Sequence, residues 1–273
     1  MSTINKYLVA IDLDGTLLRS DKTISDKSIK FLQDFEKQGN FVVISSGRAP
    51  RSILKYQELL HLKSPFIAYN GAYAHSLYDE SFKLDFKIEY SFFHKFYNDQ
   101  LNKSFSLMMC ESLNNVYYDI ENEKLLTFFN PEGMNIIKGD ITETLHENVY
   151  SSIIKLKEPL NESRKILKEY FSNIKDYEIR FWSNSEFAEI YLKGVSKGHN
   201  LEKIVEICKV LPQNVLVFGD AENDLEMLQM FENSFLMCNG LKDLFGKTKY
   251  ITQNDNDHDG VVNAIENFIK NNN

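Results

Sequence analysis

The sequence predicts an α/β protein in which a parallel-sheet core is interrupted by an inserted α+β domain. In the first third of the chain, apolar runs at residues 7–11, 41–45 and 66–69 alternate with segments of helical periodicity. Strands that are apolar without interruption, with amphipathic helices between them, are typical of a parallel sheet covered on both faces. The same pattern returns after residue 191. The core is therefore expected to be a Rossmann-like sheet with helices on both faces, built from both ends of the chain.

The elements of this core are expected to begin and end at recognisable signals. The first helix begins near Ser25 and ends at Gly39, and the second is opened by Pro50. Asn70 and Gly71 predict a tight turn after the third strand. In the last third of the chain, helices are expected at 197–210, 225–231 and 261–269, and strands at 215–218 and 234–238.

The middle of the chain has a different pattern. Segments of alternating polarity, with a turn at Asn114 and Asn115, predict an antiparallel sheet. Its strands are expected at 107–111, 116–120, 150–156 and 177–181, with helices at 121–129 and 161–171. The aromatic-rich stretch 90–97 is expected to be the packed face of a helix rather than a ligand site. The boundaries follow: a discontinuous core of residues 1–82 and 187–273, and an inserted cap domain of residues 83–186.

Composition narrows the range of partners. The chain has 273 residues, of which 43% are hydrophobic and 26% charged, as in an ordinary globular protein. A net charge of -8 argues against binding to nucleic acid or to an anionic membrane. No apolar run reaches the length of a membrane span, and Asp12 interrupts the first run too early for a signal peptide. Three widely separated cysteines, expected to be reduced, favour a cytoplasmic location.

Two carboxylates, Asp12 and Asp14, follow the first predicted strand. In extended backbone, residues two apart project to the same side, so both carboxylates are expected to enter one site. Converging carboxylates repel each other unless a cation lies beside them, and Mg²⁺ takes one or two carboxylates together with water and substrate phosphate. A turn with a helix-capping Asp is the alternative interpretation. The strand end is therefore predicted to be a magnesium site with a spare carboxylate.

A second acidic strand end supports the first. Asp220 follows a buried strand, and Asn223 and Asp224 come at the start of the next helix. Ligands of open α/β sheets bind beyond the carboxyl ends of the strands, so Asp220 is expected to share a site with Asp12. Free N–H groups and the helix dipole at Asn223 and Asp224 favour anions, although a capped helix start explains the same residues.

Two further segments offer groups suited to phosphate. Ser46, Gly47 and Arg48 follow the second strand and offer a hydroxyl and backbone donors. Lys197 lies where the chain re-enters the core and a helix begins, and its ammonium can neutralise a phosphate or a carboxylate. A solvated lysine is the alternative at that position.

In their order and setting, these segments resemble the four motifs of the haloacid dehalogenase-like superfamily: Asp-Leu-Asp-Gly-Thr at 12–16, Ser-Gly-Arg at 46–48, Lys197, and Gly-Asp-Ala-Glu-Asn-Asp at 219–224. The chain is similar to the Cof-type phosphatases of that superfamily, which carry a larger α/β cap between the second and third motifs. Asn70-Gly71 and the late Asp-Gly-Val-Val at 259–262 match the same subfamily.

The resemblance implies a role for each motif residue. Asp12 is the expected nucleophile, which forms an aspartyl-phosphate. Asp14 is the expected general acid and base, and its main-chain carbonyl, with Asp12 and Asp220, is expected to hold Mg²⁺. Lys197 is expected to hold the phosphoryl group and to restrain the charge of the nucleophile. The other residues expected to bind or orient phosphate, or to support the metal through bound water, are Ser46, Gly47, Arg48, Asn70, Asn223 and Asp224.

Several alternatives stay open at this point. The same scaffold serves phosphotransferases such as sugar phosphomutases, and a binding module without turnover is a further alternative. The expected substrate is a small phosphate ester such as a sugar phosphate, a nucleotide or a cofactor phosphate of the flavin or pyridoxal kind. Arg180, Trp182 and Glu186 are candidates to face the site, with a structural role as the alternative. The expected assembly is a monomer or a weak homodimer.

Overall fold

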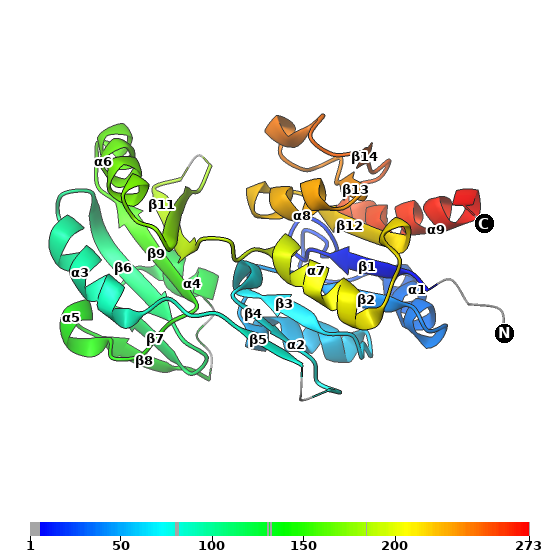
Figure 1. Ribbon diagram of the computed structural model, residues 1–273, viewed down its shortest axis with the longest axis horizontal. Helices are drawn as coiled ribbons and strands as arrows, with labels where there is room; N and C mark the ends of the chain where they lie inside the picture. Colours follow the sequence, from blue (N-terminus) through cyan, green and yellow to red (C-terminus); the bar gives the residue numbers. More distant parts are fainter. Residues whose placement is uncertain (1–5, 80–81, 130, 132, 184, 273) are drawn as a thin grey trace. The chain divides into compact units, whose positions relative to one another are not determined.

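The computed structural model describes residues 6–79, 82–129, 131, 133–183 and 185–272, and the chain forms two compact units (Figure 1). One unit contains the chain up to Leu84 and from Ser196 onward, and the other contains Asp85–Val195. The sequence placed the second boundary at residue 186. The chain enters the first unit later because residues 187–192 form a strand in the sheet of the second unit.

The centre of the first unit is a parallel sheet in the order β14-β13-β12-β1-β2. Its strands are β1 (Leu8–Ile11), β2 (Phe41–Ile44), β12 (Val215–Gly219), β13 (Asn233–Leu236) and β14 (Tyr250–Ile251). Strand β1 lies between β2 and β12, with Leu8 opposite both Phe41 and Val215. All four residues of β1 are buried, which explains their uninterrupted apolar character. The acidic residues that follow β1 and β12 therefore start from neighbouring strand ends.

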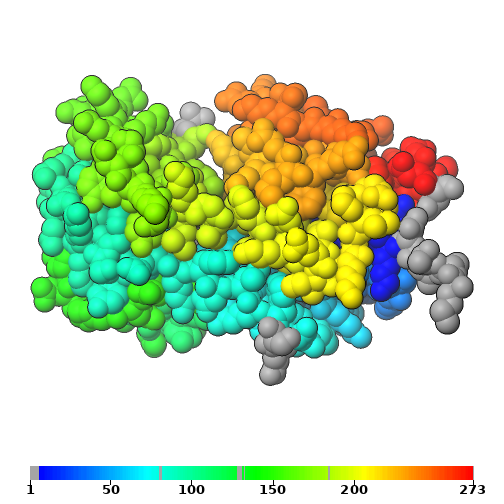
Figure 2. Space-filling view, viewed as in Figure 1, coloured from blue at the N-terminus to red at the C-terminus, as the bar shows by residue number. Residues whose placement is uncertain are grey.

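Helices cover both faces of this sheet: α1 (Asp26–Lys37), α2 (Pro50–Leu59), α7 (Lys197–Cys208), α8 (Leu225–Met230) and α9 (Gly260–Asn272). On one face, Leu201 of α7 and Met227 of α8 share a core cluster with Leu8 and Val217. The atoms of α7 and α8, yellow and orange in Figure 2, cover the sheet on that side. On the other side, α1 contacts β2 and α9. The predicted α/β class with a doubly covered parallel sheet is confirmed.

The third predicted strand does not extend the parallel sheet. Strand β3 (Phe66–Ala68) forms a separate three-stranded sheet with β4 (Tyr73–His75) and β5 (Lys83–Asp85), and pairs antiparallel with β4. Strand β3 packs beside β2, and just beyond the end of β2 Ser45 forms an isolated parallel bridge with Ile67. The reason is the turn at Tyr69–Gly71, in which Asn70 takes left-handed backbone angles and the chain reverses into β4.

The second unit has a six-stranded sheet in the order β10-β11-β9-β6-β7-β8. Its strands are β6 (Phe105–Glu111), β7 (Asn115–Tyr118), β8 (Asn135–Lys138), β9 (Ser151–Leu156), β10 (Tyr177–Phe181) and β11 (Phe187–Leu192). The predicted antiparallel pairing holds for every neighbour except β7 and β8, which are parallel. Strands β8 and β11 were not expected from the sequence.

Helices of the second unit lie on both faces of its sheet: α3 (Tyr90–Gln100), α4 (Glu123–Phe129), α5 (Ile141–Thr144) and α6 (Leu160–Ser172). Helices α3, α5 and α6 share one core cluster, and Leu125 of α4 belongs to a cluster on the other face. The aromatic stretch 90–97 is the packed face of α3, as predicted, because Phe93 and Phe96 are buried and Phe96 stacks on Phe105. Among the helices of the described ranges, none is long and apolar enough to cross a membrane.

Candidate active site

The ends of strands β1 and β12 bring three carboxylates together. The N–H of Asp12 donates to the carbonyl of Phe218 at 3.1 Å, so the two strands are still paired where the first acidic segment begins. Asp12, Asp220 and Asp224 each place one carboxylate oxygen within 4.8 Å of the others. The carboxyl edge of the parallel sheet therefore joins residues that are more than 200 positions apart in the sequence.

Lys197 is the cation of this cluster. It is the first residue of α7, whose N-cap Ser196 accepts a hydrogen bond from the N–H of His199. Its side chain is 0% exposed, and its Nζ donates to Oδ1 of Asp12 at 2.7 Å and to Oδ1 of Asp224 at 2.6 Å. Burial alone would lower the pKa of Lys197, but the two carboxylates outweigh it and raise that pKa above its usual value. The lysine is therefore charged at neutral pH.

The cluster carries more negative charge than Lys197 balances. Burial, opposed by Lys197 and supported by Asp224 and Asp220, raises the pKa of Asp12 well above its usual value. Burial and the neighbouring Asp224 raise the pKa of Asp220 to about 7. Raised carboxyl pKa values mean that three ionised groups at this spacing need another cation. The donor set is therefore suited to a divalent metal ion.

The hydrogen bonds of Asp224 separate its role from that of Asp220. One oxygen of Asp224 faces Lys197, and the other accepts from the N–H groups of Asp220 at 2.9 Å and Ala221 at 3.1 Å. Both oxygens of Asp224 are therefore in use, so Asp12 and Asp220 are the two carboxylates better suited to contact a metal ion directly. That number is what Mg²⁺ ordinarily takes from a protein. The 3₁₀ turn Glu222–Asp224, rather than the first turn of α8, carries Asn223 and Asp224.

Gly15 is required where the first acidic segment meets Asp220. Its φ is +78°, and a Cβ there would lie 2.5 Å from Oδ2 of Asp220. Both the left-handed backbone and the close approach exclude a side chain. The hydroxyl of Thr16 donates to Oδ1 of the same carboxylate at 3.4 Å. Gly15 and Thr16 of the Asp-Gly-Thr sequence therefore both contact the Asp220 carboxylate.

Asp14 is not among the three clustered carboxylates. Its carboxylate accepts from Nε of Arg48 at 2.6 Å, from Nη2 of Arg48 at 2.7 Å, and from Nζ of Lys22 at 2.7 Å. Burial pushes the pKa of Asp14 upward, but the hydrogen bonds from Arg48 and Lys22 outweigh it and lower that pKa to about 2. The expectation that Asp12 and Asp14 project to the same side assumed a continuing strand. Strand β1 ends at Ile11, and the chain then turns, with the N–H of Leu17 donating to the carbonyl of Asp12.

The segment after β2 lies beside the turn after β3. The hydroxyl of Ser46 accepts from the N–H of Arg48 at 3.2 Å, and the carbonyl of Ser46 accepts from the N–H of Asn70 at 3.1 Å. The amide of Asn223 donates to Oδ1 of Asn70 at 2.9 Å, which links this segment to the second acidic one. Gly47 packs against the Asn70 side chain. The guanidinium of Arg48, expected on phosphate, is bound to Asp14 instead.

Gly71 fixes the start of α7. Its φ is +107°, and a Cβ would lie 2.3 Å from the backbone of Ser196, the residue before Lys197. The side chain of Asn200 donates to the Gly71 carbonyl. The Asn-Gly turn predicted from the sequence therefore packs against the N-terminal end of α7, where Lys197 lies. Nothing in the sequence pattern pointed to Asn200, whose partner Gly71 is distant in the chain, or to Lys22, whose partner Asp14 lies eight residues away across an irregular turn.

The three cap candidates have partners inside the second unit. Nη1 of Arg180 lies 3.3 Å from Oε2 of Glu189, and Oε1 of Glu186 lies 3.5 Å from Nζ of Lys124. The ring of Trp182 packs against Phe187. The Arg180–Glu189 ion pair is largely buried, and the Glu186–Lys124 pair lies at the surface. All three contacts are ordinary packing within the unit, and a role toward substrate stays a prediction.

Comparisons with known proteins agree with this geometry. A family model described as haloacid dehalogenase-like hydrolase matches residues 9–265. The chain is 31% identical to the 5-amino-6-(5-phospho-D-ribitylamino)uracil phosphatase YitU of Bacillus subtilis, over 96% of this chain and 97% of that protein. It is 26% identical to the pyridoxal phosphate phosphatase YbhA of Escherichia coli, over 94% and 97%. A haloacid dehalogenase-like hydrolase from Bacteroides thetaiotaomicron has the same fold, with a TM-score of 0.79 at 22% identity over 96% of this chain and 99% of that one.

Proposed function

Since the chain belongs to the haloacid dehalogenase-like hydrolase family, we propose that it releases phosphate from a small phosphorylated metabolite by a magnesium-dependent route through Asp12. The family match covers nearly the whole chain, and the relatives described above are phosphatases that match along almost their full length. The chain is accordingly an enzyme of the phosphatase kind. We propose in addition which metal the enzyme uses, that it forms a covalent intermediate, and which class of substrate it takes.

The observation that carries the proposal is the buried contact between Asp12 and Lys197. Asp12 is 4% exposed, and one of its two oxygens is held by the ammonium at 2.7 Å. A carboxylate fixed in this way is oriented for attack on phosphorus: a bond forms between Asp12 and phosphorus while the bond from phosphorus to the ester oxygen breaks. Lys197 offsets negative charge on the phosphoryl oxygens as the transfer proceeds.

The residues present fit Mg²⁺. Asp12 and Asp220 would hold it, with the main-chain carbonyl of Asp14 as the third protein ligand by family resemblance, and Asp224 would keep Lys197 and the 220–221 backbone in place. Bound there, Mg²⁺ supplies positive charge between the carboxylates and a phosphate dianion. This explains how a protein of net charge -8 accepts an anionic substrate.

Asp14 is the proposed general acid for the departing oxygen and general base for the hydrolytic water. A carboxyl group with a pKa of about 2 is a poor acid at neutral pH, so Asp14 works only when its contacts with Arg48 and Lys22 weaken. An anionic substrate near these two cations would compete with Asp14 for them. Without those contacts, burial would raise the pKa of Asp14, so that it could take a proton from solvent and give it to the departing oxygen. The resulting carboxylate would then take a proton from the water that hydrolyses the aspartyl-phosphate.

The phosphate-binding groups proposed are the Ser46 hydroxyl, the Gly47 backbone and the Asn223 amide. Ser46 is buried, and its hydroxyl accepts from the Arg48 N–H, which fixes the oxygen and leaves its proton for an acceptor. Asn70 orients Asn223 through the 2.9 Å hydrogen bond between their amides. These groups add neutral donors to the charge supplied by Lys197.

The substrate class proposed is a small organic phosphate monoester of the sugar-alcohol, nucleotide or cofactor kind. The relatives named for activity act on a ribityl-pyrimidine phosphate and on pyridoxal phosphate, both small metabolites with a single terminal phosphate. These substrates belong to those relatives, and they guide the choice of compounds to assay.

The test is a panel of phosphate monoesters assayed with the purified protein in Mg²⁺ and in excess chelator, with inorganic phosphate measured. Phosphate release that requires Mg²⁺ supports the proposal. Phosphorus NMR of the same mixtures separates hydrolysis from transfer. A phosphoryl group that moves within a sugar phosphate without release of phosphate would instead identify a mutase.

A further inference from the structure

We propose that the turn Met237–Leu241 is a bracket that fixes the two acidic segments of the site against each other, and that Asn239 is its positioning residue. The two segments are residues 12–16, after β1, and residues 220–224, after β12. The turn follows β13, the neighbour of β12 at the same edge of the sheet. This inference rests on the proposed metal-dependent function, because it concerns how well the two segments together hold Mg²⁺.

The bracket binds the second acidic segment through main-chain hydrogen bonds. The N–H of Met237 donates to the carbonyl of Gly219 at 2.9 Å, and the N–H of Leu241 donates to the carbonyl of Asp220 at 2.8 Å. Between them, Gly240 lies so close that a Cβ would be 2.9 Å from the Asp220 carbonyl oxygen. The position of the Asp220 backbone is therefore set by this turn.

The bracket reaches the first acidic segment through one side chain. Nδ2 of Asn239 donates to the carbonyl of Gly15 at 2.8 Å. Gly15 lies between Asp14, whose carbonyl is a proposed metal ligand, and Thr16, whose hydroxyl touches the Asp220 carboxylate. A displacement of Gly15 would therefore move groups on both sides of the proposed metal.

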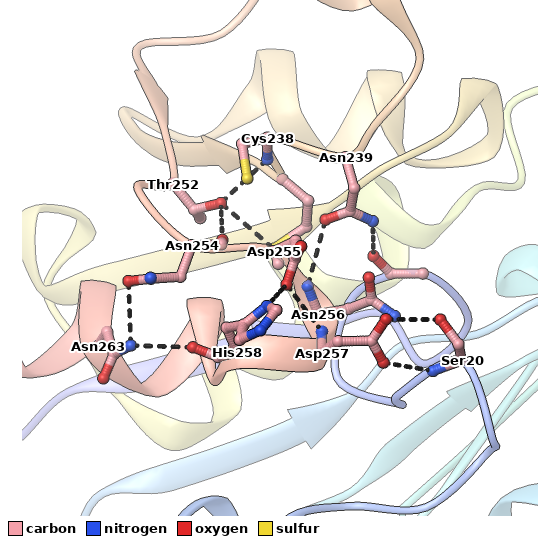
Figure 3. Close-up of polar contacts among 12 residues, drawn as sticks. Ser20, Cys238, Asn239, Thr252, Asn254, Asp255, Asn256, Asp257, His258 and Asn263 are labelled. Atoms are coloured by element: carbon pink, nitrogen blue, oxygen red, sulfur yellow. Dashed lines mark hydrogen bonds and ion pairs between the residues drawn. The ribbon is translucent and has the colours of Figure 1, made fainter.

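Asn239 is itself held in one orientation by the loop that precedes α9. Its Oδ1 accepts from the N–H of Asn256 at 3.2 Å, so the two ends of its amide have different partners (Figure 3). Nδ2 of Asn256 donates to the carbonyl of Leu18 at 2.8 Å, and the carboxylate of Asp257 accepts from the N–H of Ser20 at 2.8 Å and from its hydroxyl at 2.7 Å. The loop thus supports the stretch of chain that directly follows the segment contacted by Asn239.

A positioning role differs measurably from a merely structural one. Asn239 is exposed, so its removal leaves no buried polar group unpaired and should affect folding little. The loss of one net hydrogen bond of ordinary strength between the two segments corresponds to about a fivefold change in an equilibrium constant. We expect that change in Mg²⁺ binding rather than in unfolding.

The experiment compares Asn239→Ala with Asn263→Ala by isothermal titration calorimetry of the metal-free protein with Mg²⁺. Asn263 is a half-buried asparagine near the same loop; its amide donates to the carbonyl of His258 and to Oδ1 of Asn254, accepts from Nζ of Lys27, and does not donate to residues 12–16. Asn239→Ala should weaken Mg²⁺ binding about fivefold and raise the Mg²⁺ concentration for half-maximal phosphate release equally. Asn263→Ala should change neither, and the two variants should unfold at similar temperatures without metal.

Equal Mg²⁺ affinities of the two variants would overturn the bracket while leaving the proposed function intact. A wild-type protein that hydrolyses phosphate esters without binding Mg²⁺ would overturn both. Asn239→Ser, which keeps a shorter hydroxyl donor, should fall between wild type and alanine. If the alanine variant does not fold, the Mg²⁺ affinity of Asn239→Ser relative to wild type tests the proposal in its place.

Discussion

Replacement of Lys197 by methionine tests the electrostatic account of the site most directly. The variant keeps most of the apolar side chain but leaves Asp12 and Asp224 buried without the ammonium that lies 2.7 Å and 2.6 Å from them. Removal of one partner from a buried ion pair costs about 3–5 kcal/mol. For a protein of this size, that loss lowers the unfolding temperature by on the order of 10 °C.

The assay is thermal and urea unfolding of the metal-free protein, with Lys203→Met as the matched control. Lys203 lies in the same helix α7 but is exposed, so the same substitution there should change the free energy of unfolding by under about 0.5 kcal/mol. Phosphate release by Lys197→Met should also fall strongly, because the cation proposed to offset phosphoryl charge is gone.

The loss of stability in Lys197→Met should depend on pH. Without Lys197, burial raises the pKa of Asp12 further, so the folded variant binds protons that the unfolded chain releases above about pH 4. The deficit should therefore be larger at pH 8 than at pH 5, and Mg²⁺ should recover part of it at pH 8. A deficit below about 1 kcal/mol at both pH values would refute the reasoning.

Three further predictions follow from the same geometry. Asp12→Asn should reduce phosphate release to below about one thousandth while shifting the unfolding temperature by only a few degrees, because the amide oxygen can still accept from Lys197; unchanged activity at equal Mg²⁺ would contradict the assigned nucleophile. Asp14→Asn should show a burst of about one product per site followed by a slow phase in stopped-flow assays with p-nitrophenyl phosphate, because the leaving group of that ester needs no acid. A slow linear trace would contradict the role of Asp14 in hydrolysing the intermediate. Since the folded pKa of Asp220 is raised to about 7, its proton stabilises the metal-free protein below that pH, and this contribution is lost as the pH rises. Mg²⁺ must displace that proton, so calorimetry should find binding about tenfold weaker at pH 6 than at pH 8, with proton release at pH 6; equal affinities would show that Asp220 is not a ligand.

The sequence was sufficient for the sheet core and for the meeting of its two acidic strand ends. Uninterrupted apolar runs such as residues 8–11 predict buried parallel strands, and parallel strands bring their carboxyl ends to one edge. Asp12 and Asp220 could be placed near each other on that ground alone. Periodicity also located most of the helices, because burial of one face acts on residues within a few turns of one another.

The partners of the side chains that follow each strand depend on the tertiary structure. The direction of Asp14 depends on Arg48 and Lys22, and the end of the second unit depends on the pairing of β11 with β9. Asn239 contacts Gly15 across more than 200 residues. Such contacts leave no periodic signal, because they join groups that only the completed fold brings together. The amino-acid pattern alone therefore predicts which strand ends carry the acidic groups, and the fold sets which of those groups lie together and which are held apart.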